Sequence, residues 1–269
     1  MAKKPKHKKL RRRAVLAFCC AASVSTSLVG TAYAAGSDQA ESLFKAMSDY
    51  VSAQKDISFD VDTTVEIVTP DLQKVGLASS GAITLSRPDK IRVSRRGGLA
   101  DAELVYDGNT LSLLGKNQNA FAKVATSGSI DELIETLRHD FSFSVPAADL
   151  LSSDPYGAMT SNITDSKDLG SGVINGRECD HLAFRTEETD WEIWIAQGEM
   201  PLPCRLTITS KLVSQAPQYR IDMTNWQTGG DVAADDFQIR AAADAKEVKP
   251  AELFGLDEVS ALSAEGEQK

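Results

Sequence analysis

The chain has 269 residues, 25% of them charged and 42% hydrophobic, a composition that excludes a disordered, fibrous or multi-span membrane protein. The net charge of -9 is unevenly distributed, because residues 1–34 hold eight Lys and Arg but no Asp or Glu. The remaining residues hold 21 basic and 38 acidic side chains, a net charge of -17. Nucleic-acid binding requires a cationic surface, so this acidic body excludes nucleic acid as a partner.

Residues 1–34 have the pattern of a cleavable export signal. A basic segment is followed by an apolar segment from Ala14 to Val29 and by the small-residue end Ala32-Tyr33-Ala34. We therefore expect cleavage after Ala34 and export of the mature protein. The alternatives are an uncleaved membrane anchor and a lipid anchor on Cys19, and ordinary secretion is favoured over twin-arginine export.

The first elements of the mature chain are predicted from their hydrophobic period. Apolar residues recur at steps of three and four between Ala40 and Val51, which predicts an amphipathic helix that Ser37 or Asp38 can cap. Residues 57–68 then alternate between apolar and polar side chains, the pattern of a long half-buried strand. Shorter strands are predicted at residues 77–86, 91–95, 103–106, 110–114 and 120–124.

A helical insertion divides these strands from a second series. Ser129 to Glu132 form a capping box, which predicts a helix that ends near Asp140. Residues 141–160 are irregular, with room for one or two helical turns. Further strands are predicted at residues 162–168, 172–174, 177–185, 191–195, 204–211, 219–226 and 237–240.

Strands that follow one another through short turns predict a mainly β (α+β) fold with a single antiparallel sheet of about eleven strands, curled into an open or closed barrel. We expect one domain at residues 35–256 and a mobile acidic tail at residues 257–269. The interior of such a sheet either fills with side chains or holds a ligand. The apolar positions predicted to line it are Phe59, Val61, Val65, Ile67, Ile83, Leu85 and Trp191.

Two cysteines, Cys179 and Cys204, remain after removal of the signal. An even pair in an exported protein suggests a disulfide, which the two residues could form across neighbouring strands. Two buried thiols are the alternative. A metal site is disfavoured because Cys179 and His181 supply only two ligands where structural zinc takes four.

Catalytic groups are scarce in the mature chain. Its two histidines are His139, at the end of the predicted helix where a cation suits the helix dipole, and His181, two residues from Cys179 on one predicted strand. That spacing is poor geometry for a nucleophile and its base. The adjacent carboxylates lie on predicted solvent faces or turns, and phosphate- and dinucleotide-binding motifs are missing from the sequence. The sequence therefore argues against an enzyme.

Short motifs carry a resemblance to a known family. Residues 85–93 read Leu-Ser-Arg-Pro-Asp-Lys-Ile-Arg-Val, and residues 104–111 bring a strand into an Asp-Gly turn. In sequence and spacing they resemble the periplasmic lipoprotein-carrier superfamily of LolA and LolB. Segments at residues 173–176, 179–185, 191–195 and 201–203 more specifically resemble a group of predicted periplasmic proteins of unknown function within it. The similarity extends from about residue 40 to residue 249.

The resemblance implies an incomplete antiparallel barrel, closed by the N-terminal and mid-chain helices over an apolar cavity, and binding of acyl chains instead of catalysis. Arg87 matches the arginine before the proline that holds the lid and gates release in the carrier family; a surface arginine at a strand end is the alternative. The mature chain is longer than a typical carrier and has a cysteine pair and an acidic tail, so the resemblance does not fix the cargo as a lipoprotein.

The leading hypothesis from the sequence is a monomeric periplasmic protein that binds a lipid or the acyl chain of a lipoprotein, without a cofactor or a metal. The alternative is an envelope signalling or scaffold module of the same fold that binds another envelope protein. A hydrolase that uses His181 or Cys179 is the third hypothesis.

Overall fold

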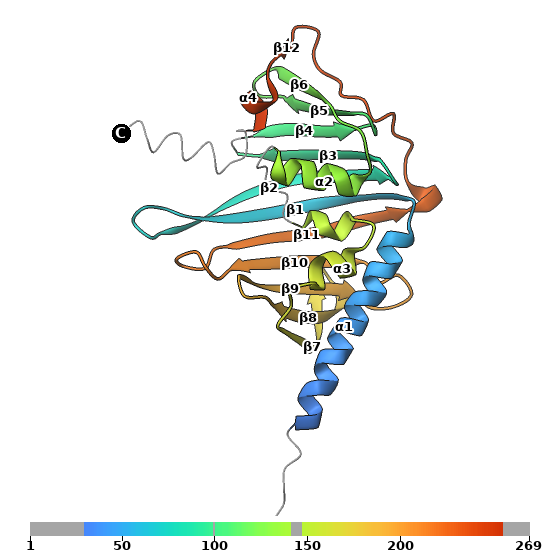
Figure 1. The fold of residues 1–269 in the computed structure, drawn as a ribbon, viewed down its shortest axis with the longest axis vertical. Helices are drawn as coiled ribbons and strands as arrows, with labels where there is room; N and C mark the ends of the chain where they lie inside the picture. The colour runs from blue at the N-terminus through green and yellow to red at the C-terminus, as the bar shows by residue number, and fades with distance from the viewer. Residues whose placement is uncertain (1–29, 99, 141–146, 255–269) are drawn as a thin grey trace, which may run out of the picture.

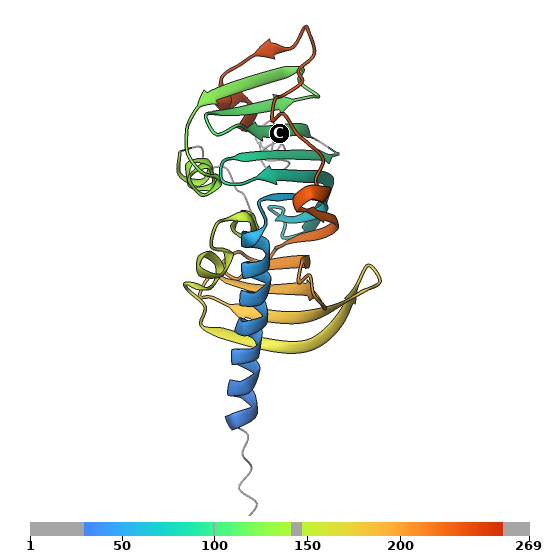
Figure 2. The same ribbon diagram turned by 90° about the vertical axis from the view of Figure 1, so that its right-hand side faces the viewer.

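The computed structural model describes residues 30–98, 100–140 and 147–254, in which one twelve-stranded sheet carries helices α1, α2 and α3 on one face (Figures 1 and 2). The strands are β1 (Asp56–Val68), β2 (Lys74–Ser86), β3 (Lys90–Gly97), β4 (Asp101–Tyr106), β5 (Thr110–Gly115), β6 (Ala120–Ala125), β7 (Asp165–Ile174), β8 (Arg177–Arg185), β9 (Thr189–Ala196), β10 (Pro203–Ser210), β11 (Gln218–Thr228) and β12 (Lys246–Glu247). The helices are α1 (Gly30–Ala53), α2 (Ile130–His139), α3 (Pro155–Thr160) and α4 (Pro250–Phe254), with short 3-10 helices η1 (Ala148–Leu151) and η2 (Gly229–Asp231). In this described part, no helix is both long enough and apolar enough to cross a membrane.

The strands form two meanders, β1 to β6 and β7 to β11, in the spatial order β12-β6-β5-β4-β3-β2-β1-β11-β10-β9-β8-β7. The meanders join where β1 pairs with β11, with Thr63 opposite Ile221. The pairs are antiparallel, and only β12 beside β6 is parallel among the described strands. Because β12 and β7 lie at opposite edges, the sheet does not close. The predicted single antiparallel sheet of an incomplete barrel is confirmed.

The strands differ from the prediction at three places. The predicted strands at residues 162–168 and 172–174 form one strand, β7, with a bulge between Asp168 and Ser171. The sequence pattern does not indicate the two-residue strand β12. The strand predicted at residues 237–240 is wrong, because Phe237 has a φ of 50° and its N–H donates to the Asp235 carboxylate at 2.6 Å. This turn geometry interrupts an extended chain.

Helix α1 begins earlier than predicted. It starts at Gly30 and runs through Ser37 and Asp38, so neither residue caps it. The predicted apolar stripe is confirmed, and the residues that it buries are Ala40, Phe44, Met47 and Val51. The position of the predicted cleavage after Ala34 lies inside this helix. Residues 1–29 of the predicted signal and the predicted acidic tail lie outside the described residues.

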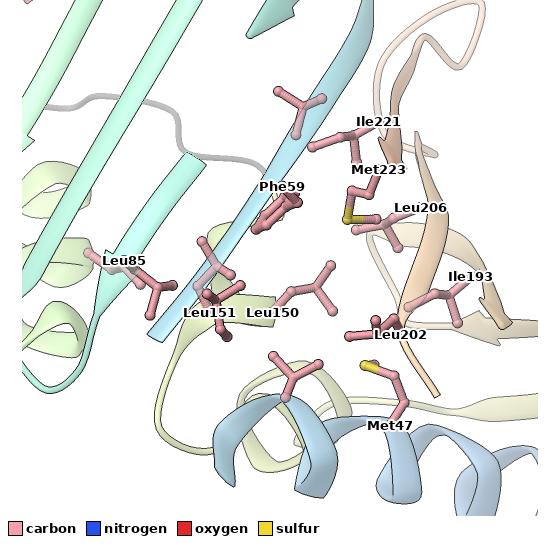
Figure 3. Close-up of a cluster of buried hydrophobic side chains, with 14 of the residues drawn as sticks. Met47, Phe59, Leu85, Leu150, Leu151, Ile193, Leu202, Leu206, Ile221 and Met223 are labelled. Carbon is pink, nitrogen blue, oxygen red and sulfur yellow. The ribbon is translucent and has the colours of Figure 1, made fainter. Parts of the chain in front are cut away.

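Helix α1 fills the helix-covered face of the half of the sheet that contains β7 to β9. The ring of Phe44 lies 5.3 Å from that of Trp191, and Phe184 is stacked on Trp191 at 4.1 Å between centroids. Figure 3 shows Met47 of the same helix next to Leu202, directly before β10, and both belong to the same buried cluster as Leu206 of β10. This half of the interior is therefore a packed core.

Helix α2 stands over the other half, and the predicted capping box fixes its start. The Ser129 hydroxyl accepts the N–H of Glu132 at 3.3 Å, and the Glu132 carboxylate accepts the N–H of Ser129 at 2.7 Å. The hydrogen bonds that the Glu132 carboxylate accepts from the N–H and the hydroxyl of Ser129 lower the pKa of that carboxyl. The residues that α2 buries are Ile130, Leu133, Ile134 and Leu137, one apolar stripe at helical spacing.

The chain after β11 wraps around the edge of the sheet. Figure 2 shows it running over the face opposite α2, after which β12 pairs with β6 and α4 returns to the helix-covered face. Leu253 of α4 packs against Leu113 of β5 and Ala122 of β6. The C-terminal segment therefore passes around the β6 edge of the sheet and contacts both of its faces.

Candidate functional site

A cavity of about 500 Å³ lies between α2 and η1 on one side and strands β1 to β5, β10 and β11 on the other. Its volume falls within the range of small-molecule pockets, about 300–1,000 Å³. The apolar side chains that line it include Phe59, Val61, Val65, Ile83, Ile91, Val93, Ala102, Leu104, Leu113, Leu114, Ile130, Leu133, Ile134, Leu137, Leu150, Leu151, Ile208, Ile221, Met223, Trp226 and Leu253. A cavity with this lining favours a hydrocarbon chain over a polar ligand.

The strand period explains the lining from the sheet. Successive side chains of a strand point to opposite faces, so Phe59 and Val61 of β1 enter the cavity while Asp60 and Asp62 are exposed. Trp226 of β11 stacks on Phe59 with 4.0 Å between ring centroids, and its Nε1 donates to the carbonyl of Pro203 at 3.0 Å. The rings of Phe59 and Trp226 therefore form a rigid wall where the two meanders meet.

Polar contacts hold the helical wall together. Arg138 of α2 donates to the Asp149 carboxylate of η1 at 2.7 Å, which raises the pKa of Arg138. The Asp131 carboxylate of α2 accepts the N–H of Ser153 at 2.9 Å. Helix α2 and the η1 segment therefore form one connected unit over the cavity.

Arg87 links this unit to the rest of the fold. Its Nε donates to the carbonyl of Gln54 at 3.2 Å and its Nη1 to the carbonyl of Leu151 at 2.8 Å. Burial lowers the pKa of the guanidinium, and its Nη2 atom is buried with no hydrogen-bond partner among the described residues. Arg87 is thus partly buried behind the cavity wall, and its predicted role in a lid is a matter for the proposal below.

The structure brings together four of the seven predicted lining residues. Phe59, Val61, Val65 and Ile83 line the cavity. Leu85 and Trp191 face the interior but are packed in the core, at 0% and 4% exposure. Ile67 lies farther along the β1–β2 hairpin, beyond the cavity lining.

Sequence reasoning missed the polar residues of the cavity. Thr63 and Arg95 line it, and the period of two could have found them, because Thr63 lies between Val61 and Val65 in register and Arg95 follows Val93. The Thr63 hydroxyl lies 2.6 Å from that of Ser79, and Arg95 Nε donates to the Ser79 hydroxyl at 2.9 Å.

The cysteines lie at one end of the sheet, on the face opposite α1. Cys179 is on β8 and Cys204 on β10, with sulfur atoms 3.1 Å apart in the thiol state. The prediction of neighbouring strands is wrong, because β9 lies between them and Cys179 pairs with Ala196. Burial raises the pKa of the Cys179 thiol to about 12. The disulfide stays a prediction.

His181 is engaged on the same face as the cysteines. Its Nε2 lies 2.7 Å from a carboxylate oxygen of Glu192, and its ring stacks on Trp194 at 4.1 Å between centroids. His139 lies at the C-terminal end of α2, 3.1 Å from Glu135. In the described part of the chain, His, Cys, Asp and Glu side chains form no group of three or more that could hold a metal.

Residues 40–250 match a family model described as a predicted periplasmic protein, DUF2092, which confirms the resemblance indicated by the later sequence motifs. No curated protein sequence matches the chain.

Solved structures similar to this one include three bacterial proteins. LprF from Mycobacterium bovis has 12% identity and a TM-score of 0.45, over 77% of this chain and 99% of that one. A LolA superfamily protein from Nitrosomonas europaea has 13% identity and a TM-score of 0.36, over 74% of this chain and 97% of that one. A chain of the Pseudomonas aeruginosa MucA/MucB complex has 15% identity and a TM-score of 0.42, over 76% of this chain and 62% of that one.

Proposed function

The chain belongs to the DUF2092 family of predicted periplasmic proteins, and from this premise we propose that it is a periplasmic binding protein that holds an acyl chain, of a lipid or of a lipoprotein, and catalyses no reaction. The observation that carries the proposal is the apolar cavity of about 500 Å³ under α2 and η1. Each CH₂ group that leaves water contributes about 0.8 kcal/mol, so a chain with about ten buried methylenes gains about 8 kcal/mol before entropic costs.

Arg87 supports a way for the ligand to enter and leave. The wall formed by α2 and η1 is joined to the end of α1 through the bonds of Arg87 to Leu151 and Gln54. If these bonds break, Leu150 and Leu151 can move away from the sheet and the cavity opens. In this proposal Arg87 holds the wall closed, the gating role that the family resemblance implies.

Lipid analysis and probe binding test the function. The full chain is expressed with its own N-terminal segment and recovered from the periplasm, and bound lipids are extracted and identified by mass spectrometry. Binding of the uncharged fluorophore N-phenyl-1-naphthylamine is then measured by titration. We expect a co-purified amphiphile and saturable binding of the fluorophore that the amphiphile reverses.

A pair of variants locates the binding. Ala102 lines the cavity on β4, and Ala78 is an exposed residue on β2 outside its lining. Ala102→Phe places a ring in the cavity and is expected to abolish fluorophore binding, whereas Ala78→Phe leaves it unchanged. Equal binding by wild type and Ala102→Phe, or no amphiphile with any wild-type preparation, contradicts the proposal. A stable complex with an envelope protein and no lipid would support the signalling or scaffold alternative instead.

A further inference from the structure

A row of apolar side chains crosses the strands of the first meander on the face that α2 covers. Residues that are paired directly across neighbouring strands lie side by side on one face of a sheet. From β1 to β6, the paired residues of this row are Phe59, Ile83, Val93, Leu104, Leu113 and Ala122. With about 4.8 Å between neighbouring strands, the row is about 24 Å long. It can therefore carry an extended acyl chain that lies across the strands.

The cavity ends one strand before the row does. The five members on β1 to β5 line the cavity, whereas Ala122 is outside the lining and is 0% exposed. Leu253 of α4, which lies beside β5 and β6 (Figure 1), packs against Leu113 and Ala122 and itself lines the cavity. The Leu253 side chain therefore covers the last position of the row and closes this end of the cavity.

The surroundings of Leu253 are apolar. Ala122 has the smallest side chain of the row, and Leu253 fills the space above it, where its own exposure is 7%. Leu104 and Val248 are packed against the same cluster. A polar headgroup buried here would lose its hydrogen bonds with water, so the hydrocarbon end of a ligand is the part that fits against Leu253.

Backbone contacts fix the position of Leu253 on the sheet. The N–H of Val248, directly after β12, donates to the carbonyl of Phe121 on β6 at 2.9 Å. The N–H of Lys249 donates to the Glu252 carboxylate at 3.1 Å, which holds the first turn of α4. Leu253 therefore stands at a defined place relative to the strands that form the floor of the cavity.

We propose that Leu253 is the end stop of the acyl-chain site and sets the longest chain that the cavity accepts. The inference rests on the proposed function, because it assigns the chain-length specificity of the same site. Each further methylene that the cavity buries raises the affinity about fourfold. A methylene that meets Leu253 gains nothing, because it stays in water or displaces α4. The affinity therefore rises with chain length up to a limit and then levels or falls.

Fatty acids that differ only in chain length test the end stop. Decanoate, laurate, myristate, palmitate, stearate and arachidate each compete with N-phenyl-1-naphthylamine for the full chain, below their micelle concentrations. Leu253→Ala removes the stop, and Leu253→Met conserves its volume. Val248→Ala is the matched control, because Val248 packs against the same cluster from the same segment but is outside the cavity lining. In the double variant Leu253→Ala with Ala122→Leu, a side chain from β6 refills the vacated space.

We expect the wild-type affinity to stop rising at one member of the series. Leu253→Ala should bind the next longer acid about 10-fold more tightly than wild type does, which corresponds to about 1.4 kcal/mol, and should leave decanoate within about twofold of wild type. Leu253→Met, Val248→Ala and the double variant should keep the wild-type limit. The same limit in wild type and Leu253→Ala, an equal shift in Val248→Ala, or a wild-type affinity that still rises at arachidate overturns the end stop and leaves the proposed function standing.

Two further outcomes are decisive. If wild type binds none of the acids, the proposed function itself fails, and the end stop fails with it. If Leu253→Ala does not fold, Leu253→Trp decides, because a larger side chain at this position reaches into the cavity. The limit should then move to a shorter acid, and an unchanged limit overturns the end stop.

Discussion

Arg87 Nη1 donates a hydrogen bond of 2.8 Å to the backbone carbonyl of Leu151, 64 residues away in the sequence. Leu151 lines the cavity from η1, and Arg87 also binds the carbonyl of Gln54, directly after α1. One guanidinium therefore connects the end of β2, the end of α1 and the wall of the cavity. This contact joins η1 to β2 and α1, in addition to the bonds of Arg138 and Asp131 that join the η1 segment to α2.

Arg87→Met should loosen that wall. Hydrogen bonds from a charged group contribute about 1.5–3 kcal/mol, so we expect a loss of about 2 kcal/mol in the free energy of unfolding and faster release of a bound fluorophore. Urea unfolding and stopped-flow dissociation of N-phenyl-1-naphthylamine measure the two effects. The exposed Arg96→Met is the control. An unchanged release rate in a destabilised Arg87→Met protein would show that Arg87 is structural and not a gate.

The bond between Arg92 of β3 and Asp235 should anchor the C-terminal segment. Arg92 Nε and Nη2 donate to the two oxygens of Asp235 at 2.6 and 2.8 Å, and both side chains are about four-fifths or more buried, at 15% and 16% exposure. We expect Asp235→Asn to lower the free energy of unfolding by about 1.5–3 kcal/mol. The matched control Asp236→Asn, at a side chain 53% exposed, should cost less than about 1 kcal/mol.

The effect of Asp235 should also depend on pH. Its hydrogen bonds with Arg92 lower the pKa of the Asp235 carboxyl in the folded state. Its contribution to stability is therefore complete above the unfolded value of about 4 and is lost as the pH falls toward the lower folded value. Urea unfolding between pH 7 and pH 3 should show the difference between wild type and Asp235→Asn shrinking at the acid end. A difference that is constant over this range would contradict the ion pair.

Tryptophan fluorescence should report which half of the interior the ligand enters. Trp226 lines the cavity beside Phe59, whereas Trp191 is packed under α1 against Phe44. A bound acyl chain should change the emission of Trp226. The change should disappear in Trp226→Phe and persist in Trp191→Phe, with palmitate as titrant. The reverse result would place the ligand under α1.

The cysteine pair should be oxidised in the exported protein. The sulfur atoms of Cys179 and Cys204 lie within contact distance. In the chain-entropy model, a disulfide between them would raise the free energy of unfolding by about 3 to 4 kcal/mol. Thiol titration of the denatured protein should find no thiol before reduction and two after it. Two reactive thiols without reductant would rule out the bridge. Cys204→Ser should then lower the melting temperature only of the unreduced protein.

Local patterns were sufficient to predict much of the fold. The period of two placed Phe59, Val61 and Val65 on one face of β1, and the capping box at Ser129 placed the start of α2. Strand β8 has the predicted bounds. Each of these features depends on hydrogen bonds and side-chain directions within a few residues, which the order of residue types reveals directly.

The same alternation could not separate cavity from core. Leu85 and Trp191 face the interior as predicted, yet they are packed in the core, whereas a cavity separates α2 from the strands near Val93. Where a helix docks depends on the shapes of two distant surfaces, and a periodic pattern describes only one surface at a time.

Long-range contacts set the remaining features of the site. The pairing of β1 with β11, the bond of Arg92 to Asp235 across 143 residues, and the bond of Arg95 to Ser79 beside the cavity join segments with no local signal for one another. Residue order can show that this chain makes a curved sheet with an apolar face. Packing in three dimensions determines where a cavity remains on this face and which side chains line it, because those properties belong to the arrangement of elements and not to any one of them.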